Sequence, residues 1–288
     1  MVEFAGENVV LNVGYTQILF HKGKEMRSDS GMCRRYDAVL PFYPGSGIHY
    51  IIEHMLVQEG DYALDLCTGS GIFAIYAADK ASWVVATDIS RRALKFAKKN
   101  TKRNKISNIR FRRGDLFGPV EGEKFDYIAT NPPFVPVPPN LSAALHSDGG
   151  SDGLCLVRRI LEQAENYLKP DGRMQMYSLT LGNETETLLE ELLRKNLGNR
   201  RVTMVSMYSE PLPLEEFTAD LEHYPVQEWR EELAGMGLTH LHSYIVNIEP
   251  GERLEITKSG IPEEERGTFP DNWKGWRERH SFWVLGKK

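Results

Sequence analysis

The sequence lacks long apolar runs, a basic leader segment and close pairs of metal-binding residues. No stretch approaches the ~20 apolar residues that a membrane-spanning helix requires, and the first ten residues hold two acids and no base. We therefore expect neither a membrane anchor nor a secretory signal. The cysteines Cys33, Cys67 and Cys155 are widely spaced, which predicts no disulfide framework and favours a reducing, cytoplasmic location. Neither they nor the eight histidines show the spacing of metal ligands, so we expect no metal.

The composition is that of an ordinary soluble globular protein. Of the 288 residues, 41% are hydrophobic and 26% are charged, and the formal net charge is -5. This length allows one large α/β domain with extensions, or one domain with a small appendage.

Short apolar runs alternate with amphipathic stretches between residues 60 and 208, which predicts a mostly parallel sheet with helices on both faces. One helical stripe runs from Leu154 to Leu168, and the sequence Lys169 to Gly172 ends it. Asn183 and Glu186 resemble a capping box ahead of a second helix. The candidate strands are Tyr62 to Cys67, Trp83 to Asp88, Asn108 to Arg112, Phe125 to Thr130, Arg173 to Leu179 and Val202 to Tyr208.

The pattern divides the chain into three parts. Residues 1–45 read as a short cap with strands at Val9 to Val13 and Gln17 to Phe20. Residues 46–208 form the core, which opens with a helix around Ile48 to Met55. Residues 209–288 form a C-terminal extension that contributes the last sheet strands. In it we expect helices at Leu214 to Leu221 and Gln227 to Met236, strands at Leu241 to Ile248 and Ser281 to Leu285, and an exposed insertion from Glu249 to Asp271.

Glycine and acidic residues recur where the first three core strands end. The segment Asp65 to Gly71 joins a buried strand to a helix, and its glycines permit a tight turn and close approach of a ligand. Asp88 ends the second strand, where a carboxylate can accept both ribose hydroxyls of a nucleoside. Asp115 follows the third strand and could accept from an adenine amino group. Each has a plain alternative, namely a ligand-free turn, a helix cap and a turn aspartate, but together they favour a nucleoside pocket.

The most specific motif is Asn131-Pro132-Pro133-Phe134, which directly follows the fourth strand. Two prolines stiffen the chain, so the Asn131 side chain and the Pro132 carbonyl should present acceptors in fixed directions to a planar NH₂ group. Phe134 could stack on that group. The alternative is a stiff loop with an ordinary turn asparagine.

These motifs, with Gly150 to Leu161, resemble in type and order the protein-glutamine methyltransferases that modify release factors and a ribosomal protein. The resemblance covers about residues 37–180. It implies a Rossmann-like class I methyltransferase fold with a seven-stranded sheet, S-adenosyl-L-methionine as cofactor and a translation-related protein as partner. Phe134 departs from the family, which usually has tyrosine there.

The resemblance also implies roles for individual residues. Asp65, Gly69 and Gly71 would hold the methionine part of the cofactor, Asp88 the ribose and Asp115 the adenine. Asn131 and Pro132 would bind the glutamine amide. The full set of predicted cofactor-binding residues is Asp65, Cys67, Thr68, Gly69, Gly71, Asp88, Ile89, Asp115, Leu116 and Asn131, and the predicted catalytic set is Asn131, Pro132 and Phe134.

A basic segment keeps a second function open. Residues 91–113 contain eleven lysines and arginines and no acid. The Lys95 to Arg113 surface could bind RNA or DNA, as an adenine-N6 methyltransferase would require, or it could be a solvated helix face. A small-molecule methyltransferase and a non-catalytic cofactor-binding protein are the remaining alternatives.

Overall fold

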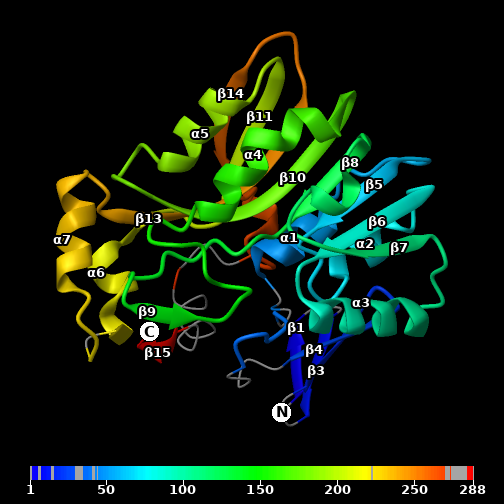
Figure 1. Cartoon of the computed structure of the whole chain (residues 1–288), viewed down its shortest axis with the longest axis horizontal. Helices are drawn as coiled ribbons and strands as arrows, with labels where there is room; N and C mark the ends of the chain where they lie inside the picture. Colours follow the sequence, from blue (N-terminus) through cyan, green and yellow to red (C-terminus); the bar gives the residue numbers. More distant parts are fainter. Residues whose placement is uncertain are drawn as a thin grey trace.

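A large twisted sheet with helices on both faces forms the body of the protein, and a small antiparallel sheet lies beside it (Figure 1). These features come from a computed structural model. The residues that the structure describes are 2–5, 8–13, 16–29, 35–40, 43, 45–221, 223–269, 273 and 284–287.

The central sheet has the strand order β14-β11-β13-β10-β8-β5-β6-β7, with the short β12 paired to β13. The pairs from β7 through β10 are all parallel, whereas β13 runs antiparallel to both β10 and β11. The strands are β5 (Tyr62–Leu66), β6 (Trp83–Asp88), β7 (Ile109–Arg113), β8 (Phe125–Thr130), β10 (Leu168–Gly182), β11 (Arg200–Ser206), β12 (Leu212–Pro213), β13 (His240–Pro250) and β14 (Glu255–Gly260).

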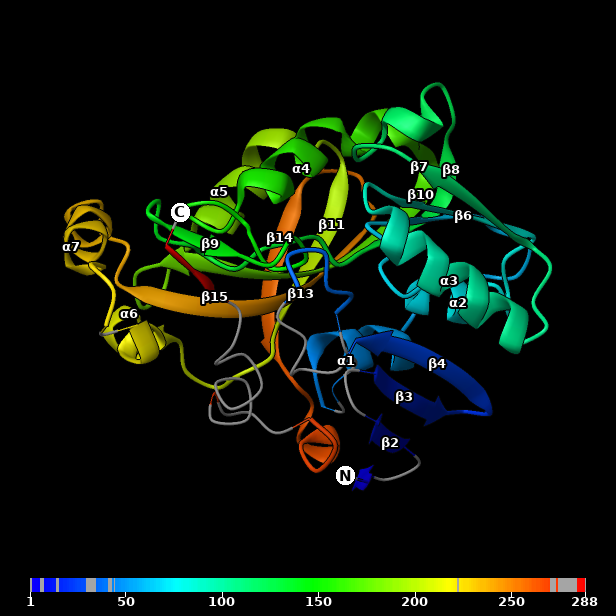
Figure 2. The ribbon, with the colours of Figure 1, turned by 60° about the horizontal axis from the view of Figure 1, so that its bottom comes forward.

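Helices cover both faces of this sheet, as Figure 2 shows. On one face lie α1 (Gly47–Glu53), α2 (Ile72–Ala77) and α3 (Arg91–Arg103), and on the other lie α4 (Cys155–Tyr167) and α5 (Leu188–Asn196). Central-strand residues such as Leu64, Val85 and Ile128 are therefore fully buried. The apolar runs that contain these residues are the basis on which parallel strands are predicted. Each of the six predicted core strands is confirmed within a few residues.

The predicted exposed insertion, Glu249 to Asp271, is wrong in part. Its residues Glu255–Gly260 form β14, which pairs in parallel with β11 at the edge of the sheet. Most of its side chains are exposed, so the segment has no apolar face that a sequence pattern could reveal. With β12 it extends the predicted seven strands to nine.

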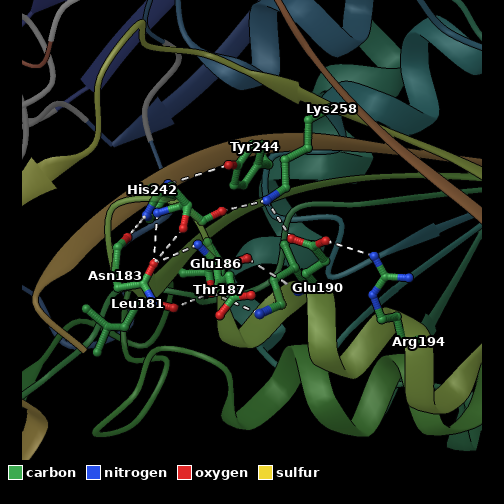
Figure 3. Close-up of polar contacts among 12 residues, drawn as sticks. Leu181, Asn183, Glu186, Thr187, Glu190, Arg194, His242, Tyr244 and Lys258 are labelled. Atoms are coloured by element: carbon green, nitrogen blue, oxygen red, sulfur yellow. Dashed lines mark hydrogen bonds and ion pairs between the residues drawn. The ribbon is translucent and has the colours of Figure 1, made fainter. Parts of the chain in front are cut away.

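The capping box predicted at Asn183 and Glu186 is also wrong. The N-cap of α5 is Thr187, whereas the Asn183 side chain accepts from the backbone N–H groups of Thr185 and Glu186, both at 2.8 Å. Asn183 is held in this turn because its carbonyl lies 2.7 Å from Nε2 of His242 on β13 (Figure 3). A tertiary contact therefore fixes a turn where the local pattern indicated a cap.

The N-terminal sheet consists of β1 (Val2–Ala5), β2 (Asn8–Val13), β3 (Thr16–His21) and β4 (Lys24–Asp29). Its predicted strands fall within β2 and β3. The buried Asn100 of α3 attaches β4 to the core, because its amide accepts from the N–H of Arg27 at 3.0 Å and donates to the carbonyl of Arg27 at 2.8 Å. The division of the chain at residues 45 and 208 stays a prediction.

A buried histidine pair joins β3 to α1. Nε2 of His21 lies 3.0 Å from Oε1 of Glu53, and Nε2 of His49 lies 3.6 Å from the same oxygen. Such a trio is close enough to hold a metal ion. However, Nδ1 of His49 accepts from the N–H of Gly45 at 3.0 Å, which places the proton of the neutral ring on Nε2. We therefore interpret the trio as an electrostatic tether, in which Nε2 of both histidines faces Oε1 of Glu53, rather than as a metal site.

The C-terminal part adds α6 (Leu214–Phe217), α7 (Gln227–Gly235) and β15 (Val284–Lys287). Both helices lie within the predicted ranges. β15 pairs with β9 (Leu141–Ala143), in the segment that follows the double proline, while residues 281–283 of the predicted last strand lie outside the described residues. Within the described part of the chain, no helix has the length and apolar character needed to span a membrane.

Candidate active site

A cavity of about 380 Å³ opens where β5, β6 and β8 end, within the size range of small-molecule sites. Parallel strands bring their carboxyl ends to one edge, which is why motifs far apart in the sequence meet there. The predicted residues that line the cavity are Cys67, Thr68, Gly69, Asp88, Ile89, Asp115, Leu116 and Asn131.

The glycine turn is a strained loop held by the next strand. Cys67, Gly69 and Gly71 have positive φ angles of 61°, 55° and 86°. The N–H of Gly69 donates to Oδ2 of Asp88 at 2.9 Å. At Gly71 a Cβ would lie 2.9 Å from the Cβ of Ala97 on α3, so glycine is required for α2 and α3 to pack.

Asp65 does not line the cavity. Its buried carboxylate accepts from the hydroxyl of Thr68 at 2.5 Å and from the N–H of Ala74 at 2.9 Å, so it holds the loop and the first turn of α2. Burial raises the pKa of Asp65 to about 7 although both hydrogen bonds act in the opposite direction. The geometry supports a positioning role rather than the direct cofactor contact that the resemblance implied.

Asp88 faces the cavity from the end of β6. Its second oxygen, Oδ1, accepts from the N–H of Ser90 at 2.8 Å, and burial raises its pKa. The N-cap of α3 is Ser90, whose hydroxyl accepts from the N–H of Ala93. The alternative that Asp88 caps this helix is therefore wrong.

Asp115 is paired with a cation that the sequence did not single out as a site residue. Nη2 of Arg159 on α4 lies 2.5 Å from Oδ2 of Asp115, and both side chains line the cavity. The signal for Arg159 lay in its place within the family-like segment Gly150 to Leu161. The carboxylate predicted to meet adenine thus has an arginine beside it.

Asn131 carries one of two buried polar atoms without a hydrogen-bond partner among the described residues of the cavity wall, the other being Oγ1 of Thr87. The unpartnered atom of Asn131 is Oδ1. A buried acceptor without a partner is unfavourable by about 1–3 kcal/mol, so its retention points to a ligand that donates to it.

Phe134 and Pro132 do not line the cavity. The Phe134 ring packs edge-on against Tyr177 with centroids 4.9 Å apart and is 8% exposed. In this arrangement the Phe134 ring belongs to the core and does not face the cavity, so it cannot stack on a substrate there. Contacts with residues outside the Asn131 to Phe134 motif hold the ring in this inward position. Gly149 and Gly153 lie so close to the Phe134 backbone that any side chain there would clash.

His146, whose spacing in the sequence indicates no ligand role, lines the cavity. Its Nδ1 lies 3.1 Å from the carbonyl of Ala38, which contributes to the same wall with Val39 and Leu40. Burial lowers the pKa of His146. No sequence pattern marks His146 as a site residue. It reaches Ala38, 108 positions earlier in the chain, only because the loop that carries it folds back to that segment.

Known proteins that resemble the chain are methyltransferases. The chain is 43% identical over 133 residues to the ribosomal protein uL3 glutamine methyltransferase of Bradyrhizobium diazoefficiens. The aligned region covers 42% of this chain and 41% of that protein. The chain is also 35% identical over 131 residues to the release factor glutamine methyltransferase of Thermodesulfovibrio yellowstonii, covering 42% and 47%. The chain thus spans less than half the length of either relative.

Among solved structures, Trm5b from Pyrococcus abyssi is similar with a TM-score of 0.49 and 19% identity, covering 87% of this chain and 62% of that one.

The cavity residues fit S-adenosylmethionine, the methyl donor that a methyltransferase of this fold implies. Carboxylates at two successive strand ends suit a nucleoside with a positively charged sulfonium group, and Asn131 offers an open acceptor beside them. The strand order is that of the Rossmann-like class I methyltransferase fold. The family model of the methyltransferase small domain matches residues 45–205, more than half of the sequence, and the chain belongs to that family.

Proposed function

We propose that this protein methylates a planar amide nitrogen, most specifically the glutamine side chain of a protein of the translation machinery. The observation that carries the proposal is the buried, unpartnered Oδ1 of Asn131 in the wall of the cofactor-sized cavity. Two relatives named as glutamine methyltransferases of uL3 and of a release factor support this class of acceptor.

The rigid corner formed by Asn131, Pro132 and Pro133 after β8 positions the amide of the acceptor. S-adenosylmethionine supplies a methyl group on a positively charged sulfur. Oδ1 of Asn131 accepts one of the two hydrogens of the amide, which aligns the nitrogen and favours its pyramidalisation as it reacts. Asp88 would hold the ribose hydroxyls, and Asp115, whose carboxylate Arg159 fixes, would hold the adenine end.

The Asn131→Ala variant tests the proposal. We expect methyl transfer to slow by about 2–4 kcal/mol in activation free energy, because one preorganised acceptor is lost, while binding of S-adenosylhomocysteine stays near normal. Asn140→Ala is the matched control, since Asn140 is exposed and, among the described residues, its side chain donates to the carbonyl of Pro225. Tritium transfer to purified release factor and uL3 measures the rates. Equal rates for the parent and Asn131→Ala would contradict the mechanism.

A second candidate, adenine-N6 methylation of RNA or DNA, is favoured by the basic surface on α3 and β7. Three of its arginines pair with acids: Arg92 with Asp29, Arg103 with Glu25 and Arg112 with Glu123. The others are exposed, and Arg110 lies 4.3 Å from the ring centroid of Trp83, which is 40% exposed. An arginine over an exposed tryptophan ring resembles part of a single-strand binding platform.

Labelling a cell extract separates the candidates. The glutamine proposal expects the methyl label in the protein fraction, and the nucleic-acid alternative expects it in RNA or DNA. Labelling confined to small molecules would support neither, and no labelling would favour a non-catalytic protein. Changing Lys98, Lys99 and Lys102 to Glu should abolish nucleic-acid methylation at low salt but leave methylation of uL3 unchanged.

A further inference from the structure

The cavity contains a histidine whose tautomer is fixed by the backbone. Nδ1 of His146 lies 3.1 Å from the carbonyl oxygen of Ala38. A carbonyl only accepts, so Nδ1 carries the proton of a neutral ring and Nε2 bears the lone pair. Nε2 has no hydrogen bond to any residue that the structure describes.

The surroundings keep this ring neutral near pH 7. Burial lowers the pKa of His146 more than the bond to Ala38 and the charge of Asp29 raise it. Asp29 on β4 is itself held by Arg92 on α3, with Nη2 at 2.6 Å from Oδ1, so its charge is partly compensated. Across the cavity the charged groups are Asp88, Asp115 and Arg159.

The other bases in the cavity wall are already engaged. Both oxygens of Asp88 accept backbone N–H groups, and Asp115 is bound to Arg159. Burial raises the pKa of the Cys67 thiol, so it stays protonated. Among the described lining residues, His146 is thus the basic group that remains available in the cavity that Asn131 also lines.

We propose that Nε2 of His146 accepts the proton that the amide nitrogen loses during methyl transfer. This inference rests on the proposed function. The nitrogen lone pair forms the bond to the methyl carbon, and the electron pair of the carbon–sulfur bond stays on sulfur. The N–H electron pair then returns to nitrogen while the proton moves to Nε2. The imidazolium later releases it to water. Asn131 orients the amide, but its carboxamide oxygen is too weakly basic to take this proton.

Two substitutions separate proton acceptance from hydrogen bonding. His146→Asn keeps a donor for the Ala38 carbonyl and removes the ε nitrogen, whereas His146→Gln keeps an acceptor near the ε position without basicity. We expect kcat for uL3 or release factor to fall about 10²-fold in both, with KM and S-adenosylhomocysteine binding within about threefold of the parent. The parent's kcat should fall with unit slope below the His146 pKa, and the variants should lack this limb.

The ring nitrogens provide a readout independent of turnover. In ¹⁵N NMR of the parent at pH 7.5 we expect a neutral ring with the proton on Nδ1. A proton on Nε2, a cationic ring, or a kcat within threefold of the parent in either variant overturns the inference. If the parent labels a glutamine and the variants match it, only this inference fails. If the parent labels no glutamine, the proposed function fails first.

Discussion

Gly71 shows how a single position shapes the cofactor loop. It combines a φ of 86° with a contact in which an added Cβ would lie 2.9 Å from the Cβ of Ala97. Gly71→Ala should therefore lower the free energy of unfolding by about 2–4 kcal/mol, since left-handed strain and overpacking add.

The control for this substitution is Gly122→Ala. Gly122 has a φ of 81° but no atom within 4 Å of its would-be Cβ, so only the strain of about 1 kcal/mol applies. Urea unfolding measures both variants. Equal losses would show that α2 and α3 yield easily at this contact.

At the same scale, the sequence placed Asp88, Asp115 and Asn131 at strand ends, and all three line one cavity. It could not assign the direction of each side chain. Asp65 turns to the hydroxyl of Thr68 and the N–H of Ala74, which satisfy its carboxylate, and Phe134 turns to Tyr177, which lies far along the chain.

Among the elements, β3 and α1 are linked by a tether that should depend on pH. Burial lowers the pKa of His49 to about 4, with repulsion from His21 adding to this effect and Glu53 opposing it. The unfolded state then binds more protons than the folded state between pH 6.5 and 4, so stability falls as the pH falls through this window.

We expect the parent to lose on the order of 2 kcal/mol more than His49→Asn between pH 6.5 and 4. Asparagine retains an acceptor for the N–H of Gly45 but does not titrate. Unfolding curves at several pH values compare the slopes. Parallel pH dependences for the two proteins would assign the acid sensitivity to other groups.

The predictability of an element depended on its burial. The strands β5, β6 and β8 lie between two helical layers, so their residues are mostly apolar on both faces and form recognisable apolar runs in the sequence. In contrast, β14 is held at the edge by backbone hydrogen bonds to β11 and has mostly exposed side chains. Backbone pairing is open to nearly any sequence, so β14 left no signal.

In the whole molecule, the C-terminal part packs on the loop that carries the site. β15 pairs with β9, and Nε1 of Trp229 on α7 donates to Oγ of Ser151 at 3.0 Å. In Figure 2, α6 and α7 lie at the end of the sheet beside β13. These contacts hold residues 134–153, whose two ends carry Phe134 and the glycines packed on it.

Trp229→Phe should lower stability by about 1 kcal/mol and raise KM for the protein acceptor more than it lowers kcat, because the loop loses a support but no reacting group changes. Trp83→Phe, on the exposed side of β6, is the matched control and should leave KM unchanged. Steady-state kinetics with uL3 measures both. A change confined to kcat would place α7 in the chemistry rather than in acceptor binding.

The sequence by itself determined the parallel core, the strand ends that bear acids and the stiff corner at Asn131. These features are local, since apolar periodicity, glycine turns and proline restrict the backbone within a few residues. Only the tertiary structure decided that Arg159 meets Asp115, that His146 meets Ala38 and that His21 joins His49 and Glu53. Such pairs depend on how separate elements pack, and no short pattern encodes the approach of residues over 25 positions apart.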